Sequence, residues 1–108
     1  MEQQEEKFYQ SKAKDGRRIW VITRTLGDLK YYCGYLELLA GDEYYQLPSR
    51  YLELDPEITF AGKGIEVNVP SASGNDIYIG IDTADPANNN WTMNDVFARL
   101  KEIENELL

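Results

Sequence analysis

The chain has 108 residues, 43% of them hydrophobic, which suits a single domain, residues 1–108, built around one modest core. It contains no histidine and only one cysteine, Cys33. An internal disulfide and cysteine-rich zinc sites are therefore excluded, and the usual base of Ser-His or Cys-His catalysis is missing. The formal net charge of −8 argues against unaided binding to nucleic acid and favours basic proteins as partners.

The negative charge is unevenly placed along the chain. Residues 1–50 hold eight basic and eight acidic side chains, whereas residues 51–108 hold three and eleven. An acidic surface also keeps a small protein in solution without any partner, so the imbalance alone assigns no function. No apolar run approaches the roughly 20 residues of a membrane span, and the first residues have neither a basic leader nor an apolar run, so we expect no membrane contact and a cytoplasmic location.

Two strand patterns come first along the chain. The dipeptide Asp15-Gly16 favours a tight turn between strand-like flanks, which predicts a hairpin, although an N-terminal helix over residues 2–12 is an alternative. A second strand pattern covers residues 31–38, and we expect one of its faces to be buried and the other exposed. The two faces consist of Tyr31, Cys33 and Tyr35 on one side and Tyr32, Gly34, Leu36 and Leu38 on the other.

Residues 42–54 contain Pro48 and little periodicity, which predicts a long surface connection with about one helical turn. A second hairpin is expected over residues 57–69, with its turn at residues 61–64. The apolar residues expected on the buried face of its second arm are Ile65, Val67 and Val69.

The last strand pattern covers residues 76–82, where apolar and other residues alternate. We expect Ile77, Ile79 and Ile81 to face the core and Tyr78, Gly80 and Asp82 to occupy the opposite face.

Residues 92–107 show the clearest helix pattern. Thr92 is a good N-cap with Asp95 in the capping-box position, and Trp91 can pack on Val96 as a hydrophobic staple. The apolar stripe consists of Val96, Phe97, Leu100, Ile103 and Leu107, and the other face carries Arg99, Lys101, Glu102, Glu104 and Glu106. Together these elements predict an α+β fold, in which an antiparallel sheet of about five strands is covered on one face by a C-terminal amphipathic helix.

Carboxylates gather between the last strand and the helix. Asp82 closes the strand, Asp85-Pro86 starts a turn, and residues 88–90 lead into the helix, which explains nearly all of these side chains structurally. The alternative is that Asp82 and Asp85, with Asp55, bind a hard cation or a basic group of a partner, although their spacing matches no calcium loop. We therefore assign no metal, no cofactor and no catalytic residue.

Tyrosine is frequent, with eight in the chain and five of them within residues 31–45. Its ring offers a large contact area at small entropic cost and can stack on nucleotide bases, while nearby arginine or lysine side chains can hold phosphates. The residues that we predict to bind a ligand are Tyr44, Tyr45, Arg50, Arg24, Lys30 and Lys63.

Three short motifs, CGYLEL, ITFAG and IGIDTA, followed by a tryptophan and a C-terminal helix, resemble a group of small phage and prophage proteins of unassigned activity. The resemblance spans about residues 33–105. That group has histidines where this chain has Asp55-Pro56-Glu57 and Asp85, so a histidine-dependent role does not carry over. The resemblance implies a phage accessory protein, and small acidic α+β proteins of this kind are often counter-defence factors.

Three functions are open under this resemblance. The first is non-catalytic sequestration of a nucleotide immune signal similar to cyclic ADP-ribose, as in the Thoeris anti-defence proteins, with a small nucleotide as partner. The alternative is mimicry of nucleic acid, as in many anti-CRISPR proteins, which would inhibit a basic host protein. The third is a metal-dependent phosphodiesterase that uses Asp82 and Asp85. The edges of a small antiparallel sheet also predict a homo-oligomer.

Overall fold

A computed structural model describes residues 6–12, 16–26, 29–67, 69, 76–83 and 91–107, with the backbone alone at residues 6–8, 11, 12, 25, 26, 29, 30 and 107. In chain order the elements are β1 (Glu6–Lys12), β2 (Arg18–Leu26), β3 (Leu29–Leu38), α1 (Arg50–Leu54), β4 (Phe60–Lys63), the 3-10 helix η1 (Gly64–Val67), β5 (Ile77–Asp82) and α2 (Met93–Leu107).

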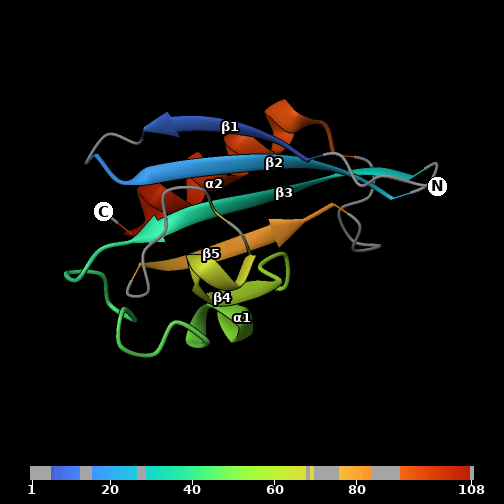
Figure 1. Ribbon diagram of the computed structural model, residues 1–108. Helices are drawn as coiled ribbons and strands as arrows, with labels where there is room; N and C mark the ends of the chain where they lie inside the picture. Colours follow the sequence, from blue (N-terminus) through green and yellow to red (C-terminus); the bar gives the residue numbers. More distant parts are fainter. Residues whose placement is uncertain are drawn as a thin grey trace.

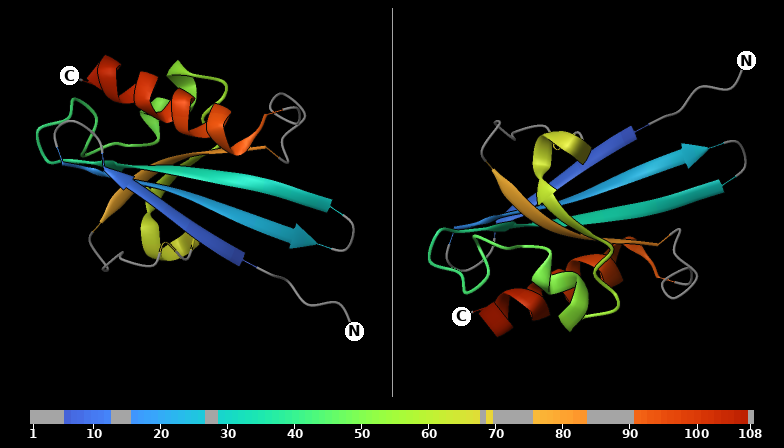
Figure 2. Two further views of the ribbon diagram at one scale, coloured as in Figure 1. Left: turned by 90° about the horizontal axis from the view of Figure 1, so that it is seen from above. Right: turned by 90° about the horizontal axis from the view of Figure 1, so that it is seen from below.

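The five strands form one antiparallel sheet in the order β1-β2-β3-β5-β4, which confirms the predicted α+β fold (Figure 1). Both α-helices lie on one side of this sheet, and η1 lies on the other (Figure 2). No helix in the described part of the chain is both long enough and apolar enough to cross a membrane.

The first hairpin is present as predicted. β1 and β2 pair from Glu6 with Arg24 to Lys12 with Arg18, so the alternative helix over residues 2–12 is wrong for the described residues 6–12. Gly16 has a φ of 87°, a left-handed conformation that glycine adopts without the steric cost of a side chain. Asp15, the other residue of the predicted turn, lies outside the described residues.

Both faces of the sheet are buried, and the expectation of one exposed face on residues 31–38 is wrong. Leu36 and Leu38 pack with α2 on one face, while Cys33 and Tyr35 belong to a second buried cluster on the other. β5 behaves in the same way, because Ile79 is fully buried on the helix side and the other face is buried too. Strand alternation thus predicted which residues share a face but not how each face is covered.

The second predicted hairpin does not form. Residues 61–63 of the expected turn belong to strand β4, which pairs with β5, and the 3-10 turn η1 takes up Gly64 and residues 65–67 of the expected second arm. The Glu66 carboxylate accepts a hydrogen bond from the Lys63 N–H at 3.1 Å, and this local contact turns the chain away from the sheet. As a result Ile65, predicted to be buried, is 56% exposed.

Helix α2 begins as predicted. The Thr92 N–H donates to the Asp95 carboxylate at 2.9 Å, and the Asp95 N–H donates to the Thr92 hydroxyl at 3.2 Å, which is a complete capping box. Val96 and Leu100 are fully buried against the sheet. Glu104, predicted on the exposed face, is instead 2% exposed, and its Oε2 has no hydrogen-bond partner among the described residues.

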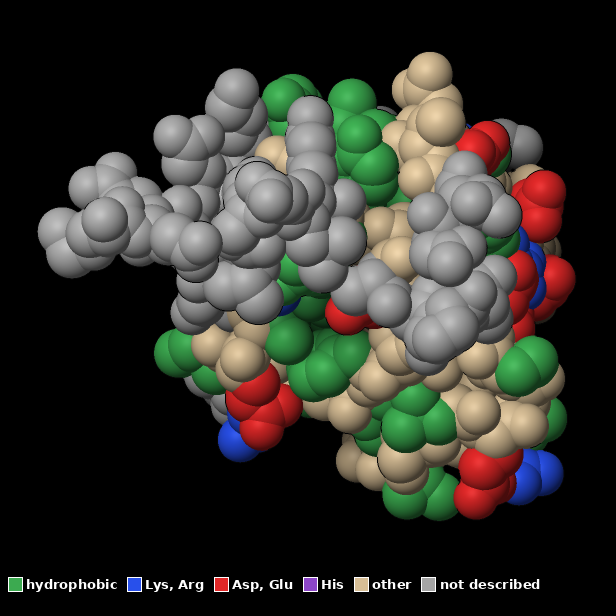
Figure 3. Space-filling model, turned by 90° about the vertical axis from the view of Figure 1, so that its right-hand side faces the viewer, with side chains coloured by type: hydrophobic (Ala, Val, Ile, Leu, Met, Phe, Trp, Pro, Cys, Tyr) green, Lys and Arg blue, Asp and Glu red, His purple; other side chains and the backbone are tan. Residues whose placement is uncertain are grey.

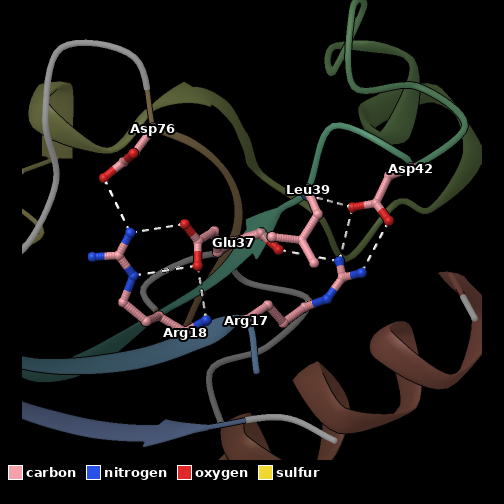
Figure 4. Close-up of polar contacts among 6 residues, drawn as sticks. All are labelled: Arg17, Arg18, Glu37, Leu39, Asp42 and Asp76. Carbon is pink, nitrogen blue, oxygen red and sulfur yellow. Dashed lines mark hydrogen bonds and ion pairs between the residues drawn. The ribbon is translucent and has the colours of Figure 1, made fainter. Parts of the chain in front are cut away.

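A network of ion pairs holds the chain where β3 ends (Figure 4). The Arg17 guanidinium donates to both oxygens of Asp42, at 2.8 and 2.9 Å, and to the Glu37 carbonyl, while Asp42 also accepts the Leu39 N–H at 2.7 Å. Arg18 pairs with Glu37 on the next strand at 2.8 Å. Arg17 and Asp42 are almost fully buried, so this pair fixes the start of the long connection that follows.

Candidate functional site

A cleft of about 480 Å³ lies between residues 43–58 and helix α2. Its lining combines aromatic, aliphatic and charged side chains, a mixture typical of ligand sites. The lining residues are Glu43, Tyr44, Tyr51, Leu54, Asp55, Ile58, Arg99, Ile103 and Glu106.

The wall formed by residues 43–58 is a series of short turns. The Tyr45 N–H donates to the Asp42 carbonyl at 3.2 Å, and the Leu47 N–H donates to the Tyr44 carbonyl at 3.0 Å, before α1 begins. Because the Arg17–Asp42 pair anchors the start of this segment, Glu43 and Tyr44 are held at the mouth of the cleft by a buried contact.

Arg99 joins the two walls. Its guanidinium donates to Asp55, and its Nε donates to Glu57 at 2.7 Å; both carboxylates follow α1, on the wall opposite α2. Burial opposes the charge of Arg99, but the hydrogen bond to Glu57 and the charges of Asp55 and Glu57 outweigh burial and raise its pKa. Glu106 approaches Arg99 at 3.8 Å, too far for a hydrogen bond.

Two tyrosines form the aromatic part of the cleft. The rings of Tyr44 and Tyr51 meet edge to face, with centroids 5.4 Å apart and an interplanar angle of 81°. Tyr51 lies near the surface but is only 7% exposed, and its hydroxyl has no hydrogen-bond partner among the described residues. An unsatisfied buried hydroxyl costs about 1–3 kcal/mol. Burial raises the pKa of Tyr51. The backbone of Tyr44 lies near the Tyr51 hydroxyl without forming a hydrogen bond to it, and its influence offsets part of that rise.

Exposed leucines occur along the same wall. Leu54 lines the cleft and is 53% exposed, and Leu47 and Leu52 are also exposed. Single exposed apolar residues are ordinary, but three within one short segment indicate a surface that can bury apolar area against a partner.

A more open hollow adjoins the cleft at Arg99 and is lined by Glu57, Trp91, Asp95, Ala98, Arg99 and Glu102. Among the described residues, three carboxylates line the cleft and three others line the hollow, and Arg99 is the one cation that lines either of them. We call these two depressions together the acidic surface. In the space-filling view, several acidic side chains lie along the right-hand margin of the molecule, with basic side chains beside some of them (Figure 3).

The six residues predicted to bind a ligand do not meet at one place. Tyr44 lines the cleft, Tyr45 packs beside it on the helix-side core, and Arg50 lies next to Tyr44 but is paired with Glu53. Arg24 is on the opposite face of the sheet, where it donates to the Val67 carbonyl at 2.9 Å. Lys63 is exposed at the end of β4. Lys30 belongs to β3, where the structure describes its backbone but not its side chain.

The aspartates considered as cation ligands are also separated. Asp55 is bound to Arg99 on the helix side, whereas Asp82 lies beside Cys33 on the other face. Asp85 lies outside the described residues, so its part in a turn stays a prediction. No group of three or more Cys, Asp or Glu side chains is arranged to hold a metal ion in the portion of the chain that the structure describes.

Cys33 belongs to the buried cluster on the face away from α2. Its Sγ lies 3.7 Å from the Arg24 guanidinium, and it is 1% exposed. Burial, with the nearby charge of Asp82, raises the pKa of the Cys33 thiol to about 11, so the group is a neutral thiol at physiological pH. Cys33 is therefore a core residue.

Sequence reasoning missed Arg99 and Tyr51 as parts of a site. Arg99 looked like one of several charged residues on the exposed side of a helix, and its partner Asp55 is 44 residues away in sequence. Tyr51 lies outside the dense tyrosine cluster of residues 31–45. The signal in the sequence is the group of leucines and acidic residues around Pro48, because surface loops are usually rich in polar turn residues instead.

Comparisons of the chain with protein-family models, curated proteins and solved structures found no match. The resemblance to phage and prophage proteins therefore stays a prediction.

Proposed function

We propose that the protein is a non-catalytic binding protein whose acidic surface engages a positively charged region of a partner protein. The observation that carries this proposal is the charge of that surface, where the described lining residues include six carboxylates and, as their one cation, Arg99. Since Arg99 is already bound by Asp55 and Glu57, the remaining charge is negative and attracts a cation.

The exposed leucines beside the cleft extend this proposal from an ion-binding surface to a protein-binding one. Charge alone speeds and orients an encounter, whereas buried apolar area supplies lasting affinity. A partner region with basic side chains and neighbouring apolar groups would match Leu47, Leu52 and Leu54 together with the carboxylates. The natural candidates are proteins whose basic region otherwise holds nucleic acid, which corresponds to the mimicry given above as the alternative to sequestration. Under the phage resemblance the partner would be a host protein.

Sequestration of a nucleotide signal is the second candidate. It is supported by the contact of Tyr44 with Arg50, which places an aromatic ring beside a cation. It ranks second because Arg50 is paired with Glu53 and the adjoining cleft carries surplus carboxylates, which repel phosphate groups.

The test is a comparison of wild type with a double charge reversal, Glu102→Lys with Glu106→Lys. Partners retained by each tagged protein are identified by mass spectrometry, and the main partner is then purified and titrated by calorimetry. We expect a basic partner, a loss of affinity of at least about tenfold on reversal of the two charges, and a similar loss when salt is raised from ~0.05 to ~0.5 M. Nucleic acid bound to the partner should be displaced by wild type.

An affinity that is insensitive to both charge reversal and salt would contradict the proposal. Calorimetry with cyclic ADP-ribose isomers and cyclic dinucleotides tests the second candidate in parallel. Saturable binding of one of these nucleotides, reduced in Tyr44→Ala and unchanged in the double charge reversal, would replace the first candidate with the second.

A further inference from the structure

We infer that the cleft between residues 43–58 and α2 is a receptor for the guanidinium group of an arginine carried by the partner. This inference rests on the proposed function and names the chemistry that the cleft recognises. It commits to one side chain seated in the cleft, whereas the proposed function requires only a basic partner on the acidic surface.

The aromatic walls suit a planar cation. Tyr44 and Tyr51 meet edge to face, so the two rings present surfaces in two orientations. A guanidinium attracts the negative face of an aromatic ring and also stacks on it, which a compact ammonium group does less well. The cleft volume of about 480 Å³ is ample for a guanidinium with its aliphatic stem, and Ile58 and Ile103 offer apolar contacts for that stem.

The charges of the cleft leave two carboxylates for a ligand. Asp55 is engaged by Arg99, whereas Glu43 makes no side-chain ion pair with another described residue, and Glu106 approaches Arg99 at 3.8 Å with a side chain that is 68% exposed. An entering guanidinium can therefore pair with Glu43 or Glu106 without displacing the Arg99–Asp55–Glu57 cluster. That cluster keeps the two walls together while the ligand binds.

The Tyr51 hydroxyl is the second, independent observation. It belongs to a cleft-lining residue that is 7% exposed, yet it has no hydrogen-bond partner among the described residues. The hydroxyl is buried in the cleft wall, so a ligand with several N–H groups can satisfy it, at the same time as a carboxylate, when the Tyr51 ring turns toward the ligand. Arginine has five N–H donors in one plane, and lysine has three on a single nitrogen, so arginine is the better match.

The experiment is a titration of ¹⁵N-labelled protein, followed by NMR, with two peptides of identical shape: acetyl-Gly-Arg-Gly-amide and its citrulline counterpart, in which the guanidinium is replaced by a neutral urea. We expect the arginine peptide to shift the amide signals of residues 43–58 and of the last two turns of α2, and the citrulline peptide to cause no saturable change. A lysine peptide should bind several-fold more weakly than the arginine peptide.

Two variants and one control locate the contacts. Tyr51→Phe keeps the ring and removes the hydroxyl, and Glu106→Gln removes one charge; each should weaken arginine binding about five- to tenfold. Glu66→Gln removes the same charge outside the cleft and keeps an acceptor for the Lys63 N–H, so it should leave binding unchanged. Tyr51→Phe should also be at least as thermally stable as wild type, because it removes an unsatisfied buried hydroxyl, which shows that its effect on binding is not a loss of fold.

Equal binding of the citrulline peptide, lysine binding as tight as arginine binding, or an equal loss in Glu66→Gln would each overturn the inference. Its failure is separable from that of the proposed function. If the arginine peptide does not bind but a basic partner still responds to the reversal of Glu102 and Glu106, only the inference fails. If the peptide behaves as expected but no basic partner is retained, only the proposed function fails.

Discussion

The two faces of the sheet are both buried, but they are covered by different means. On the helix side the core is largely aliphatic, with residues such as Val21, Leu36 and Ile81 packed against α2. On the other side the core is rich in aromatic rings, including Trp20 and Tyr35; η1 lies over that face, and Val69 packs into its core.

The difference shows how a small domain can close two faces with a single long helix. A helix buries a flat aliphatic layer with its own apolar stripe, whereas large rings bury enough area to close a face under a short segment. Tyr35 and Phe60 meet edge to face with centroids 5.9 Å apart, which fills the space between β3 and β4 across β5. The cleft belongs to the helix side, where two separate covering segments meet.

The largest expected effect tests the aliphatic side. Leu100 is fully buried under α2, so Leu100→Asp places a charge in the core and should cost more than about 4 kcal/mol, enough to abolish cooperative unfolding. Lys101→Asp introduces the same side chain at the adjacent exposed position and should change stability by less than about 1 kcal/mol. Urea unfolding followed by circular dichroism measures both, and similar curves for the two variants would refute the packing of α2.

Smaller losses of stability are expected when a methyl group is added at a glycine on each face of the sheet. A Cβ at Gly34 would lie 2.4 Å from Val96 Cγ1 and 2.9 Å from Leu100 Cδ1, so Gly34→Ala pushes against the helix. A Cβ at Gly80 would lie 2.6 Å from the Tyr35 ring on the other face. We expect losses of about 2–3 kcal/mol for Gly34→Ala and about 1–2 kcal/mol for Gly80→Ala in the free energy of unfolding.

A double mutant sharpens this comparison. In a Val96→Ala background the space beside Gly34 is larger, so Gly34→Ala should lose about 1 kcal/mol less than in wild type, while the cost of Gly80→Ala should not change. An equal reduction for both glycines would mean that the two faces are not independent.

The smallest effect is specific to the aromatic side. Because burial raises the pKa of Cys33 to about 11 from an ordinary value of 9.0, the folded protein holds the thiol proton more tightly than the unfolded chain. The resulting stabilisation is complete below pH 9 and is lost as the pH rises toward 11. Between pH 8 and about 9.7 the free energy of unfolding of wild type should therefore fall by roughly 1 kcal/mol more than that of Cys33→Ala. Parallel pH profiles would show that Cys33 is accessible to water.

Local signals in the sequence predicted the elements that depend on local contacts. The capping box of Thr92 and Asp95 needs only neighbouring residues and is present, and Gly16 has the left-handed φ that suits the predicted turn. The prediction of the second hairpin was wrong because the alternation in residues 65–69 fits a strand as well as it fits the observed 3-10 turn. Which of the two forms depends on the Glu66 contact and on the pairing of β4 with β5. Strand alternation also could not reveal that aromatic residues would close the second face.

The candidate site was predicted only in part. The tyrosine cluster led to Tyr44, which lines the cleft, but charge and composition could not show that Arg24 would lie on the opposite face. Arg99 gains its role from Asp55 and Glu57, whose distance in sequence leaves no local pattern to recognise. Sites assembled from distant segments depend on the tertiary fold, and this cleft is one of them.

The strand order has a kinetic consequence. β1, β2 and β3 are joined by short connections, so their pairing closes only small loops, whereas β5 pairs with β3 only after residues 39–76 have been brought back to the sheet. Closing that long loop costs entropy before any contact repays it, and such non-local pairing slows folding. The arrival of β5 completes the cores of both faces and provides the partner for β4, so the rate-limiting barrier to folding is expected at this one docking event.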